Sequence, residues 1–427
     1  MRLKLKPERN ILLVGDLIIR VLSGRVSIFG AEYVEGSEVV VEKLTSAPLE
    51  VLEESDIEIE FGDEGYITET QIKLIPDEWK DVAEEIISLP HGSTVMLCAN
   101  VDTGKSGFIC YTANRAVAKN KRVVVIGADT GQSEMNPPMT IGMALIDSHI
   151  IHLSQLEYRK AFFVGSTSPA GMLERSIVGV IKMLKEAKKL DPDIVMINTT
   201  GWVHGNGGRE LKELKLLAVS PDFVVILEKE KDELNYIHSV AERMNIKYRV
   251  LPAAPRLRSR TREERRRLRT RYYAREFRDA KEIKISVDEV SFMYSYFGTG
   301  VTPNAEEILG IVNILGYKPE YMEKTPDAMI IVTERQISDD KIDVLTQTLG
   351  CTVKVFSPKI FENMVVGLLD EEANMINMGI ITKFDPESRL FTIYTRTDPD
   401  EIKIVAFGRI KVNLEFEEVE WLEPWSL

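Results

Sequence analysis

The sequence predicts an α/β protein in which a doubly wound parallel sheet carries a phosphate-binding loop. The octapeptide at 99–106 reads Ala-Asn-Val-Asp-Thr-Gly-Lys-Ser, follows the apolar run 94–98 and precedes a helical pattern over 107–119. From residue 93 to about 250, nearly continuous β-branched runs alternate with helical stretches. Buried parallel strands joined by helices have this pattern, and such proteins bind ligands at the carboxyl ends of their strands.

The octapeptide supplies the predicted nucleotide-binding residues: Ala99, Asn100, Val101, Asp102, Thr103, Gly104, Lys105 and Ser106. A loop of this kind binds an anion through its backbone N–H groups and the positive end of the helix dipole. We expect Lys105 to reach the β- and γ-phosphates and Ser106 to coordinate Mg²⁺. Ala99 stands where the first glycine is usual, but alanine is small enough for the strand and helix to approach closely. A chance Gly-Lys-Ser turn is the alternative, and the flanking patterns argue against it.

Length and composition indicate an ordinary globular protein of two or three domains. The chain has 427 residues, of which 44% are hydrophobic and 28% charged. The sequence shows no apolar run of membrane-spanning length and no secretory signal, so we expect a cytoplasmic protein without a membrane partner. Cys98, Cys110 and Cys351 lack metal-ligand spacing, and we expect buried thiols in a reducing compartment.

Positive charge is concentrated in one segment. The net charge of −13 argues by itself against a nucleic-acid partner. Residues 256–275, however, contain ten arginines against Glu263 and Glu264, so this segment carries +8 and the rest of the chain −21. A solvated charged helix is the alternative reading. The use of arginine alone favours phosphate binding, because guanidinium groups bind phosphate oxygens in pairs.

We expect three domains. Residues 1–75 contain short apolar strands separated by turns, which predicts a small all-β domain. Residues 76–285 contain the phosphate-binding loop, the α/β pattern and the arginine segment, and form the predicted P-loop domain. Residues 286–427 mix helices with strands, the last two over 401–405 and 409–413, which predicts a mixed α/β domain.

Polar side chains follow the predicted strands at the edge where ligands are expected. Asp129 comes directly after the second strand, where an acid can hold Mg²⁺ through water or accept a proton from an attacking hydroxyl. Gln132 is a neutral ligand for water or metal. Two later strand ends offer the hydroxyl of Thr167 and a tryptophan, Trp202, held between glycines.

Together these motifs resemble the polynucleotide 5′-hydroxyl kinase family, which includes the kinase subunit of the pre-mRNA cleavage factor and the pre-ribosomal-RNA-processing kinase. Archaeal members are the most similar. The resemblance covers most of the chain and is weakest in the last domain. The Thr-Gly-Trp segment at 200–207 is its most specific part, because many unrelated enzymes share P-loops. The other matching segments are 21–24, 27–32, 102–106, 129–132 and 165–169.

The resemblance implies transfer of the γ-phosphoryl group of ATP, or of another NTP, to the 5′-hydroxyl end of RNA or DNA. Lys105 and the loop amides would hold the donor. Ser106 and Thr167 would hold Mg²⁺, and Gln132 would order the metal shell. Asp129 would take the proton from the 5′-hydroxyl. Such a reaction depends on positioning and on stabilising spread negative charge.

The resemblance also implies an acceptor site and an arginine lid. Gln132, Thr200 and Trp202 would contact the acceptor, with Trp202 stacked on a terminal base; a core tryptophan is the alternative. Arginines between 258 and 271 would close over the phosphates. Two registers fit this lid: Arg262, Arg267 and Arg271, or Arg260, Arg265 and Arg269. We favour the first, because the tyrosine pair at 272–273 resembles an aromatic pair of the family.

One position departs from the family pattern. The Asp-x-Gly-Gln element often has a second acidic residue two positions earlier, and here that position is Gly127. This departure favours an alternative class, a nucleotide-binding scaffold that holds RNA-processing partners and catalyses nothing. A P-loop NTPase that hydrolyses ATP is the other alternative. The sequence leaves open RNA versus DNA, the preferred NTP and the oligomeric state.

Overall fold

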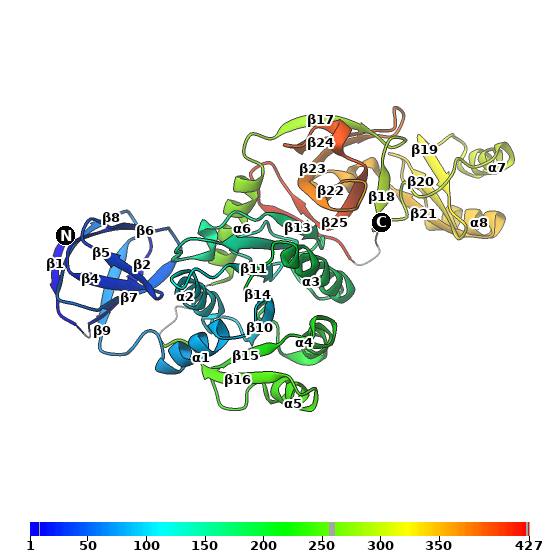
Figure 1. The fold of residues 1–427 in the computed structure, drawn as a ribbon. Helices are drawn as coiled ribbons and strands as arrows, with labels where there is room; N and C mark the ends of the chain where they lie inside the picture. The colour runs from blue at the N-terminus through cyan, green and yellow to red at the C-terminus, as the bar shows by residue number, and fades with distance from the viewer. Residues whose placement is uncertain (8, 256–260, 424–425, 427) are drawn as a thin grey trace. The chain divides into compact units, whose positions relative to one another are not determined.

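The computed structural model describes four stretches of the chain: 1–7, 9–255, 261–423 and 426. These residues form two compact units (Figure 1). The first unit comprises Met1–Phe162 and Ser168–Arg269, and the second comprises Phe163–Thr167 and Thr270–Leu427. Helix α6 (Arg262–Glu276) contains the boundary between them. The three-domain division made from the sequence is a different partition of the chain, and it stays a prediction.

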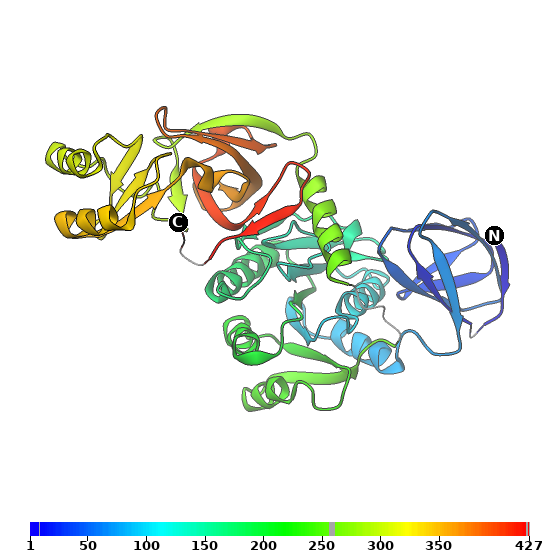
Figure 2. The ribbon, with the colours of Figure 1, turned by 180° about the vertical axis from the view of Figure 1, so that it is seen from behind.

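Among the described residues up to Thr70, nine strands form two antiparallel sheets, blue in Figures 1 and 2. Alternate side chains of each strand enter the shared core; in β3 these are Leu17, Ile19 and Val21. One sheet has the order β1 (Arg2–Leu5), β8 (Ser55–Phe61), β3 (Leu17–Ser23) and β6 (Glu38–Val41). The other has the order β5 (Ala31–Val34), β4 (Arg25–Ile28), β7 (Ser46–Val51), β2 (Asn10–Val14) and β9 (Tyr66–Thr70).

A seven-stranded sheet forms the centre of the first unit and confirms the predicted fold class. Its order is β13 (Lys160–Phe163), β12 (Thr140–Ile146), β11 (Val123–Ala128), β14 (Ile194–Thr199), β10 (Ser93–Ala99), β15 (Phe223–Glu228) and β16 (Lys247–Pro252). The five strands from β11 to β16 are parallel, whereas β12 is antiparallel to β11. The sequence pattern does not predict β16, because this edge strand exposes most of its side chains and lacks a buried apolar run.

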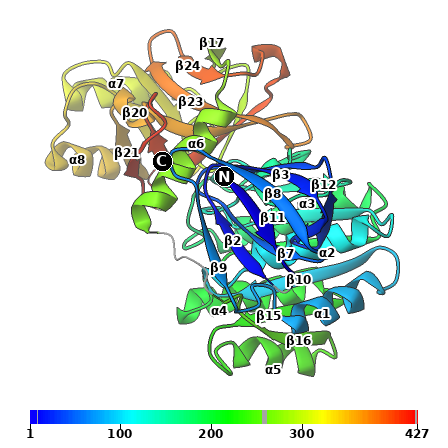
Figure 3. The same cartoon turned by 90° about the vertical axis from the view of Figure 1, so that its left-hand side faces the viewer.

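Helices cover both faces of this sheet. In β10, Val95 and Leu97 pack in one core with α1 (Asp77–Ile87) and α2 (Lys105–Val117). Their neighbours Met96 and Cys98 pack in another core with α4 (Gly205–Val219) and α5 (Asn235–Arg243). Figure 3 shows α1 and α2 on one side of β10 and α4 on the other. Helix α3 (Leu173–Lys188) packs against α4.

Hydrogen bonds and packing at the turn between β4 and β5 link the N-terminal strands to α2. The side-chain amide of Asn114 in α2 donates to the carbonyl oxygens of Phe29 (2.9 Å) and Ile150 (2.7 Å). Its Oδ1 accepts from the N–H of Ile150 at 2.9 Å. Gly30 lies against the ring of Tyr111, also in α2. The helix that follows the P-loop therefore also fixes the position of the N-terminal strands.

The second unit contains two sheets (Figure 2). The larger has the order β17 (Lys281–Ser286), β24 (Leu390–Thr395), β23 (Met375–Asp385), β22 (Met364–Leu369), β25 (Ile404–Val412) and β18 (Ser291–Met293), with β26 (Glu418–Trp421) also paired to β25. The smaller consists of β19 (Tyr321–Lys324), β20 (Ala328–Val332) and β21 (Thr352–Phe356), accompanied by α7 (Ala305–Leu315) and α8 (Asp339–Leu349). Two strands predicted at 401–405 and 409–413 are one, because buried Ala406 and Phe407 continue the ladder.

The cysteine prediction is partly wrong. Cys98 and Cys110 are buried free thiols, but Cys351 is partly exposed. It follows Gly350, where the chain leaves the end of α8. In the part of the chain that the structure describes, no helix combines the length and the apolar character needed to cross a bilayer.

Candidate active site

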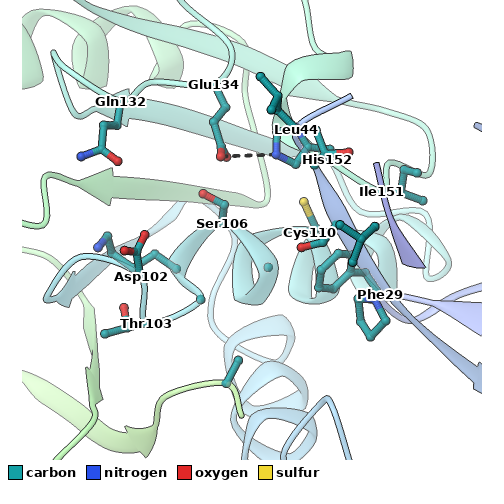
Figure 4. A pocket seen from close by; sticks show the side chains of 18 of the residues that line it. Phe29, Leu44, Asp102, Thr103, Ser106, Cys110, Gln132, Glu134, Ile151 and His152 are labelled. Atoms are coloured by element: carbon teal, nitrogen blue, oxygen red, sulfur yellow. Dashed lines mark ion pairs between the residues drawn. The ribbon is translucent and has the colours of Figure 1, made fainter. Parts of the chain in front are cut away.

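A cavity of about 520 Å³ lies over the P-loop in the first unit. One wall is polar and consists of the P-loop, the chain after β11 and β14, and the start of α6. The opposite wall is mainly apolar and comes from the N-terminal strands, their turns and α1. Figure 4 shows Asp102 and Gln132 on the polar side, and Phe29, Leu44 and Ile151 on the apolar side.

The P-loop joins β10 to α2, and its backbone is shaped to surround an anion. Asp102 and Gly104 have φ angles of 53° and 98°, so the chain turns through left-handed conformations before α2 begins at Lys105. Lys105 Nζ donates to the carbonyl oxygens of Asn100 (2.8 Å) and Ala99 (3.3 Å). The loop thus holds a cation next to the amino end of a helix, which is the arrangement that binds phosphate.

The remaining residues of the octapeptide hold this loop in shape. Asn100 Nδ2 donates to Glu233 Oε1 (2.8 Å), and Asn100 Oδ1 accepts from the N–H of Val101 (2.7 Å). Thr103 Oγ1 donates to the carbonyl of Asn100 at 3.0 Å. Ala99 is fully buried at the end of β10. Its small side chain therefore suits the position where a glycine is usual.

Asp129 lines the same cavity as Lys105. Asp129 Oδ1 accepts hydrogen bonds from the backbone N–H groups of Gly131 and Gln132, both at 3.1 Å, which fixes the carboxylate at the end of β11. Burial lowers the pKa of Lys105, and the Asp129 carboxylate is the main opposing influence. Gln132 also lines the cavity. The structure brings these three side chains to one cavity, and their chemical roles stay predictions.

Glu134 is an acidic residue of the cavity that the sequence analysis does not single out. Its side chain is 9% exposed, and Oε1 lies 3.3 Å from His152 Nε2 (Figure 4). The position where the family often has its second acid holds no side chain, because a Cβ on Gly127 would overlap Asn136 Oδ1 and meet Ser133 Oγ. The loop that follows Asp129 nevertheless adds a further carboxylate to this wall, that of Glu134.

The oxygen donors of the polar wall suit a magnesium ion, which prefers hard oxygen ligands and keeps several of its waters. These donors belong to Ser106, Asp129, Gln132 and Glu134. Within the described residues, no cluster of three or more His, Cys, Asp or Glu side chains forms a complete metal site. A P-loop site needs no such cluster, because a hydroxyl and the phosphate oxygens of the nucleotide supply ligands.

The arginine segment reaches the cavity through α6. Arg265 Nη2 lies 3.0 Å from Asp102 Oδ2, so this arginine is tied directly to the P-loop. Arg267 lines the cavity and pairs with Glu263 at 2.6 Å. Arg265 belongs to one of the two predicted registers and Arg267 to the other. The structure brings one arginine of each to the P-loop side of the molecule, and the choice between registers stays open.

Among the described residues, the lining of this cavity does not include Arg262, Arg271 or Thr167. Arg262 is exposed at the start of α6. Arg258 and Arg260 lie outside the described residues. Arg271 and Thr167 belong to the second unit. The roles assigned to these residues therefore stay predictions.

Trp202 is half-buried on the loop between β14 and α4. Its ring lies against the first turn of α4: a Cβ on Gly207 would come within 2.7 Å of the ring, and one on Gly208 within 3.2 Å. Both glycines therefore leave room for the indole. Thr200 is buried, and its Oγ1 accepts from the N–H of Trp202 at 3.4 Å. A half-buried ring is compatible with base stacking and with a packing role, so both readings of Trp202 stay open.

The sequence analysis also misses the apolar wall, because its members are far apart in the chain and look like ordinary core residues. They are Leu12, Val14, Phe29, Leu44, Pro48, Tyr66, Leu74 and Trp79. Asn198 at the end of β14 lines the cavity too, and its Oδ1 is buried without a hydrogen-bond partner among the described residues. In the sequence, Asn198 directly precedes the Thr-Thr-Gly-Trp run, and this position is the one feature that could have marked it as a cavity residue.

The fold and the cavity define a P-loop nucleotide-binding protein of the α/β class. The profile of the family described as mRNA cleavage and polyadenylation factor CLP1 P-loop matches residues 99–279. The polyribonucleotide 5′-hydroxyl-kinase of Pyrococcus furiosus is 32% identical, over 83% of this chain and 97% of its own length. The polyribonucleotide 5′-hydroxyl-kinase of Methanocaldococcus jannaschii is 27% identical, over 78% and 91% of the two chains.

The chain belongs to the polynucleotide 5′-hydroxyl kinase family. This confirms the resemblance given by the motifs. A chain of the solved Clp1p–Pcf11p complex matches with a TM-score of 0.65 at 13% identity, over 96% of this chain and 97% of its own. That similarity shows the fold alone.

Proposed function

We propose that this protein is an enzyme that transfers the γ-phosphoryl group of ATP, or of another NTP, to the 5′-hydroxyl end of RNA. The observation that carries the proposal is the cavity itself, which joins the P-loop, Asp129 and the start of the Thr-Gly-Trp segment at Gly201. Related chains that match this one over 91–97% of their own length are named polyribonucleotide 5′-hydroxyl-kinases. DNA ends are the second acceptor to compare, because stacking on a terminal base does not distinguish the two.

The polar wall supplies the groups that hold the donor. Lys105 leaves the carbonyls of Ala99 and Asn100 and binds the β- and γ-phosphates, while the N–H groups at the start of α2 surround them. Ser106 would hold Mg²⁺, and Gln132, Asp129 and Glu134 are further oxygen donors in the same cavity. Bound Mg²⁺ neutralises charge on the phosphate oxygens. Arginines of α6 add positive charge above them.

On the acceptor side, Asp129 takes the proton of the 5′-hydroxyl as that oxygen forms its bond to the γ-phosphorus and the bond to the β-phosphate oxygen breaks. The two backbone N–H groups that hold Asp129 Oδ1 leave the other carboxylate oxygen to face the acceptor. Trp202 stacks on the terminal base, which orients the 5′ end without demanding a particular sequence.

The apolar wall is the proposed site of the nucleotide base. It faces the phosphate loop across a cavity of about 520 Å³, which is within the range of pockets that enclose small ligands, roughly 300–1,000 Å³. Aromatic and aliphatic side chains such as Phe29, Leu44 and Pro48 offer flat apolar contacts to a purine ring.

The two alternative functions are less well supported. The scaffold alternative rests on the missing acid at Gly127, but Glu134 adds a carboxylate to the same wall. A hydrolytic NTPase needs no acceptor site, and the names of the related proteins favour kinases. RNA-processing partners and a cytoplasmic location belong to the same proposal; three free thiols, as expected in a reducing compartment, support the location.

A transfer assay tests the proposal. Purified protein is incubated with Mg²⁺, γ-labelled ATP and matched RNA or DNA oligonucleotides that carry a 5′-hydroxyl, with 5′-phosphorylated oligonucleotides as the control. We expect label on the 5′-hydroxyl RNA and none on the control. ATP hydrolysis that proceeds equally without any oligonucleotide, or ATP binding with no transfer, would contradict the proposal and favour the NTPase or the scaffold respectively.

A further inference from the structure

Helix α4 sends two lysines into the interior of the first unit. The side chains of Lys212 and Lys215 are 0% and 1% exposed. Both lie behind the strand ends that form the polar wall of the cavity, and neither lines the cavity itself. Lysine is rarely buried to this extent unless an acidic partner compensates its charge.

Lys212 joins two strands to the acceptor loop. Its ammonium donates to Thr199 Oγ1 at 2.7 Å and to the carbonyl oxygen of Thr200. Thr199 Oγ1 in turn donates to the carbonyl of Leu97 in β10 at 2.6 Å. The bond to Thr200 fixes the last peptide before Gly201 and Trp202, so Lys212 holds the point from which the acceptor loop departs.

Lys215 acts at the neighbouring strand end. Its ammonium lies 3.5 Å from the carbonyl oxygen of Ala128, the residue directly before Asp129. Burial lowers the pKa of Lys215 to about 8, and the negative charge of Asp129 is the main opposing influence. Lys215 therefore sits close to the proposed base, on the side away from the nucleotide.

The hydrogen bonds of these two residues do not by themselves offset the cost of burying their charges. The hydrogen-bond partners of both ammonium groups are neutral oxygens, of Thr199, Thr200 and Ala128. Neutral partners recover only part of the cost of removing a cation from water. A methionine of similar length would fill the same space without that cost, and such replacements of buried charges are often neutral or stabilising.

We propose that Lys212 and Lys215 are positioning residues that set the geometry of the acceptor half of the active site, Lys212 through the Thr200 carbonyl and Lys215 through the Ala128 carbonyl. This inference rests on the proposed function. A small displacement of a reacting group costs much of the rate, about 10²-fold for 1 Å. Losing either contact therefore slows transfer, while the P-loop, to which neither ammonium group donates among the described residues, keeps its nucleotide.

The test compares Lys212→Met and Lys215→Met with a matched control, Lys185→Met, which removes an exposed lysine from α3. Four quantities are measured on each purified full-length protein: Tm, ATP affinity, kcat with a 5′-hydroxyl RNA, and the affinity for that RNA. We expect kcat to fall about 10- to 100-fold in both test variants. ATP affinity should stay within about twofold of wild type, and Tm should be unchanged or higher. Lys212→Met should also weaken RNA binding.

Two results would overturn the inference. Transfer rates and RNA affinities equal to those of Lys185→Met would exclude a positioning role. A fall in kcat that is matched by falls in Tm and ATP affinity would show that the lysines only support the fold. A wild-type protein that transfers no phosphate and binds no RNA would instead refute the proposed function, and this inference with it. Wild-type activity with unaffected variants refutes the inference alone.

Discussion

The two walls of the cavity are built in different ways. The P-loop side of the polar wall comes from consecutive residues, whose backbone N–H groups and side chains act on one ligand group, and a short motif therefore reveals it. The apolar wall comes from residues between Leu12 and Trp79 that meet only because the N-terminal strands pack on α2. The difference teaches that phosphate chemistry is local in sequence, whereas contacts to the rest of a nucleotide depend on long-range packing.

If the polar wall performs the chemistry, Lys105→Ala should have the largest effect. Among the described residues, Lys105 donates only to carbonyl oxygens of its own loop, so its loss should leave Tm nearly unchanged. We expect phosphoryl transfer to fall by more than about 10³-fold, because a preorganised positive charge on the phosphates is lost. The transfer assay and a thermal melt on the same preparation measure both quantities. Normal transfer by a well-folded variant would contradict the assignment of the P-loop.

Asp129→Asn sharpens the comparison within the polar wall, because it keeps the shape of the side chain and removes its charge. We expect kcat to fall about 10²–10⁴-fold, the usual contribution of a positioned base, while ATP affinity changes little. Asp147→Asn, in an exposed position, is the control. Turnover that survives within about tenfold, below that usual range, would assign the base elsewhere.

The arginine registers can be separated by two single variants. Arg265 is tied to Asp102 of the P-loop, whereas Arg267 pairs with the exposed Glu263. Against the register favoured from the sequence, the ion pair of Arg265 with Asp102 leads us to expect that Arg265→Ala lowers kcat about 10²-fold, as for loss of one charge stabiliser, and that Arg267→Ala has the smaller effect. A larger loss in Arg267→Ala would favour the register of Arg262, Arg267 and Arg271.

Trp202→Ala separates stacking from packing. A stacked base is worth about 1–3 kcal/mol, so we expect RNA affinity to weaken roughly ten- to a hundredfold while ATP affinity and Tm barely change. If the ring is mainly a packing element on α4, Tm should fall sharply and both affinities should fall together. An unchanged RNA affinity in a stable variant would exclude stacking.

The variant with the smallest expected effect tests whether the apolar wall binds the base of the nucleotide. Leu44→Ser removes apolar contact from the proposed base site and should weaken ATP binding about three- to tenfold. Inorganic triphosphate, which has no base, should bind the variant and the wild type equally. Leu309→Ser, at a 60% exposed position, is the control. Equal weakening for ATP and triphosphate would mean that the change disturbs the phosphate side, and would remove the distinction between the walls.

The parts of the site that could be predicted from sequence are those whose signal is contiguous. The strand, loop and helix around 99–106 and the acid after β11 are of this kind. Glu134 was not recognised because an acid six residues after the end of β11 has no fixed spacing to identify it. The burial of Lys212 and Lys215 could not be predicted for another reason. They alternate with Glu210 and Glu213 in a pattern that reads as a solvated helix face, yet the structure buries both lysines.

The same distinction explains the fold. Buried parallel strands appear in the sequence as apolar β-branched runs, so the central sheet could be predicted. Edge strand β16 has no such run, and its place beside β15 comes from packing. The order of strands in the sheet, in which β10 lies between β14 and β15, also decides which strand ends share a cavity. No single segment of the sequence predicts that order.

The hydrogen bonds from Asn114 to Phe29 and Ile150 have a consequence for how this protein changes over time. They make the N-terminal strands a fixed but separate part of the nucleotide cavity. On the proposed function, substitutions among the first 75 residues would alter which base is accepted, while the residues proposed to move the phosphoryl group stay untouched. Donor preference and catalytic chemistry would then be encoded in different stretches of chain, so each could be selected without the other.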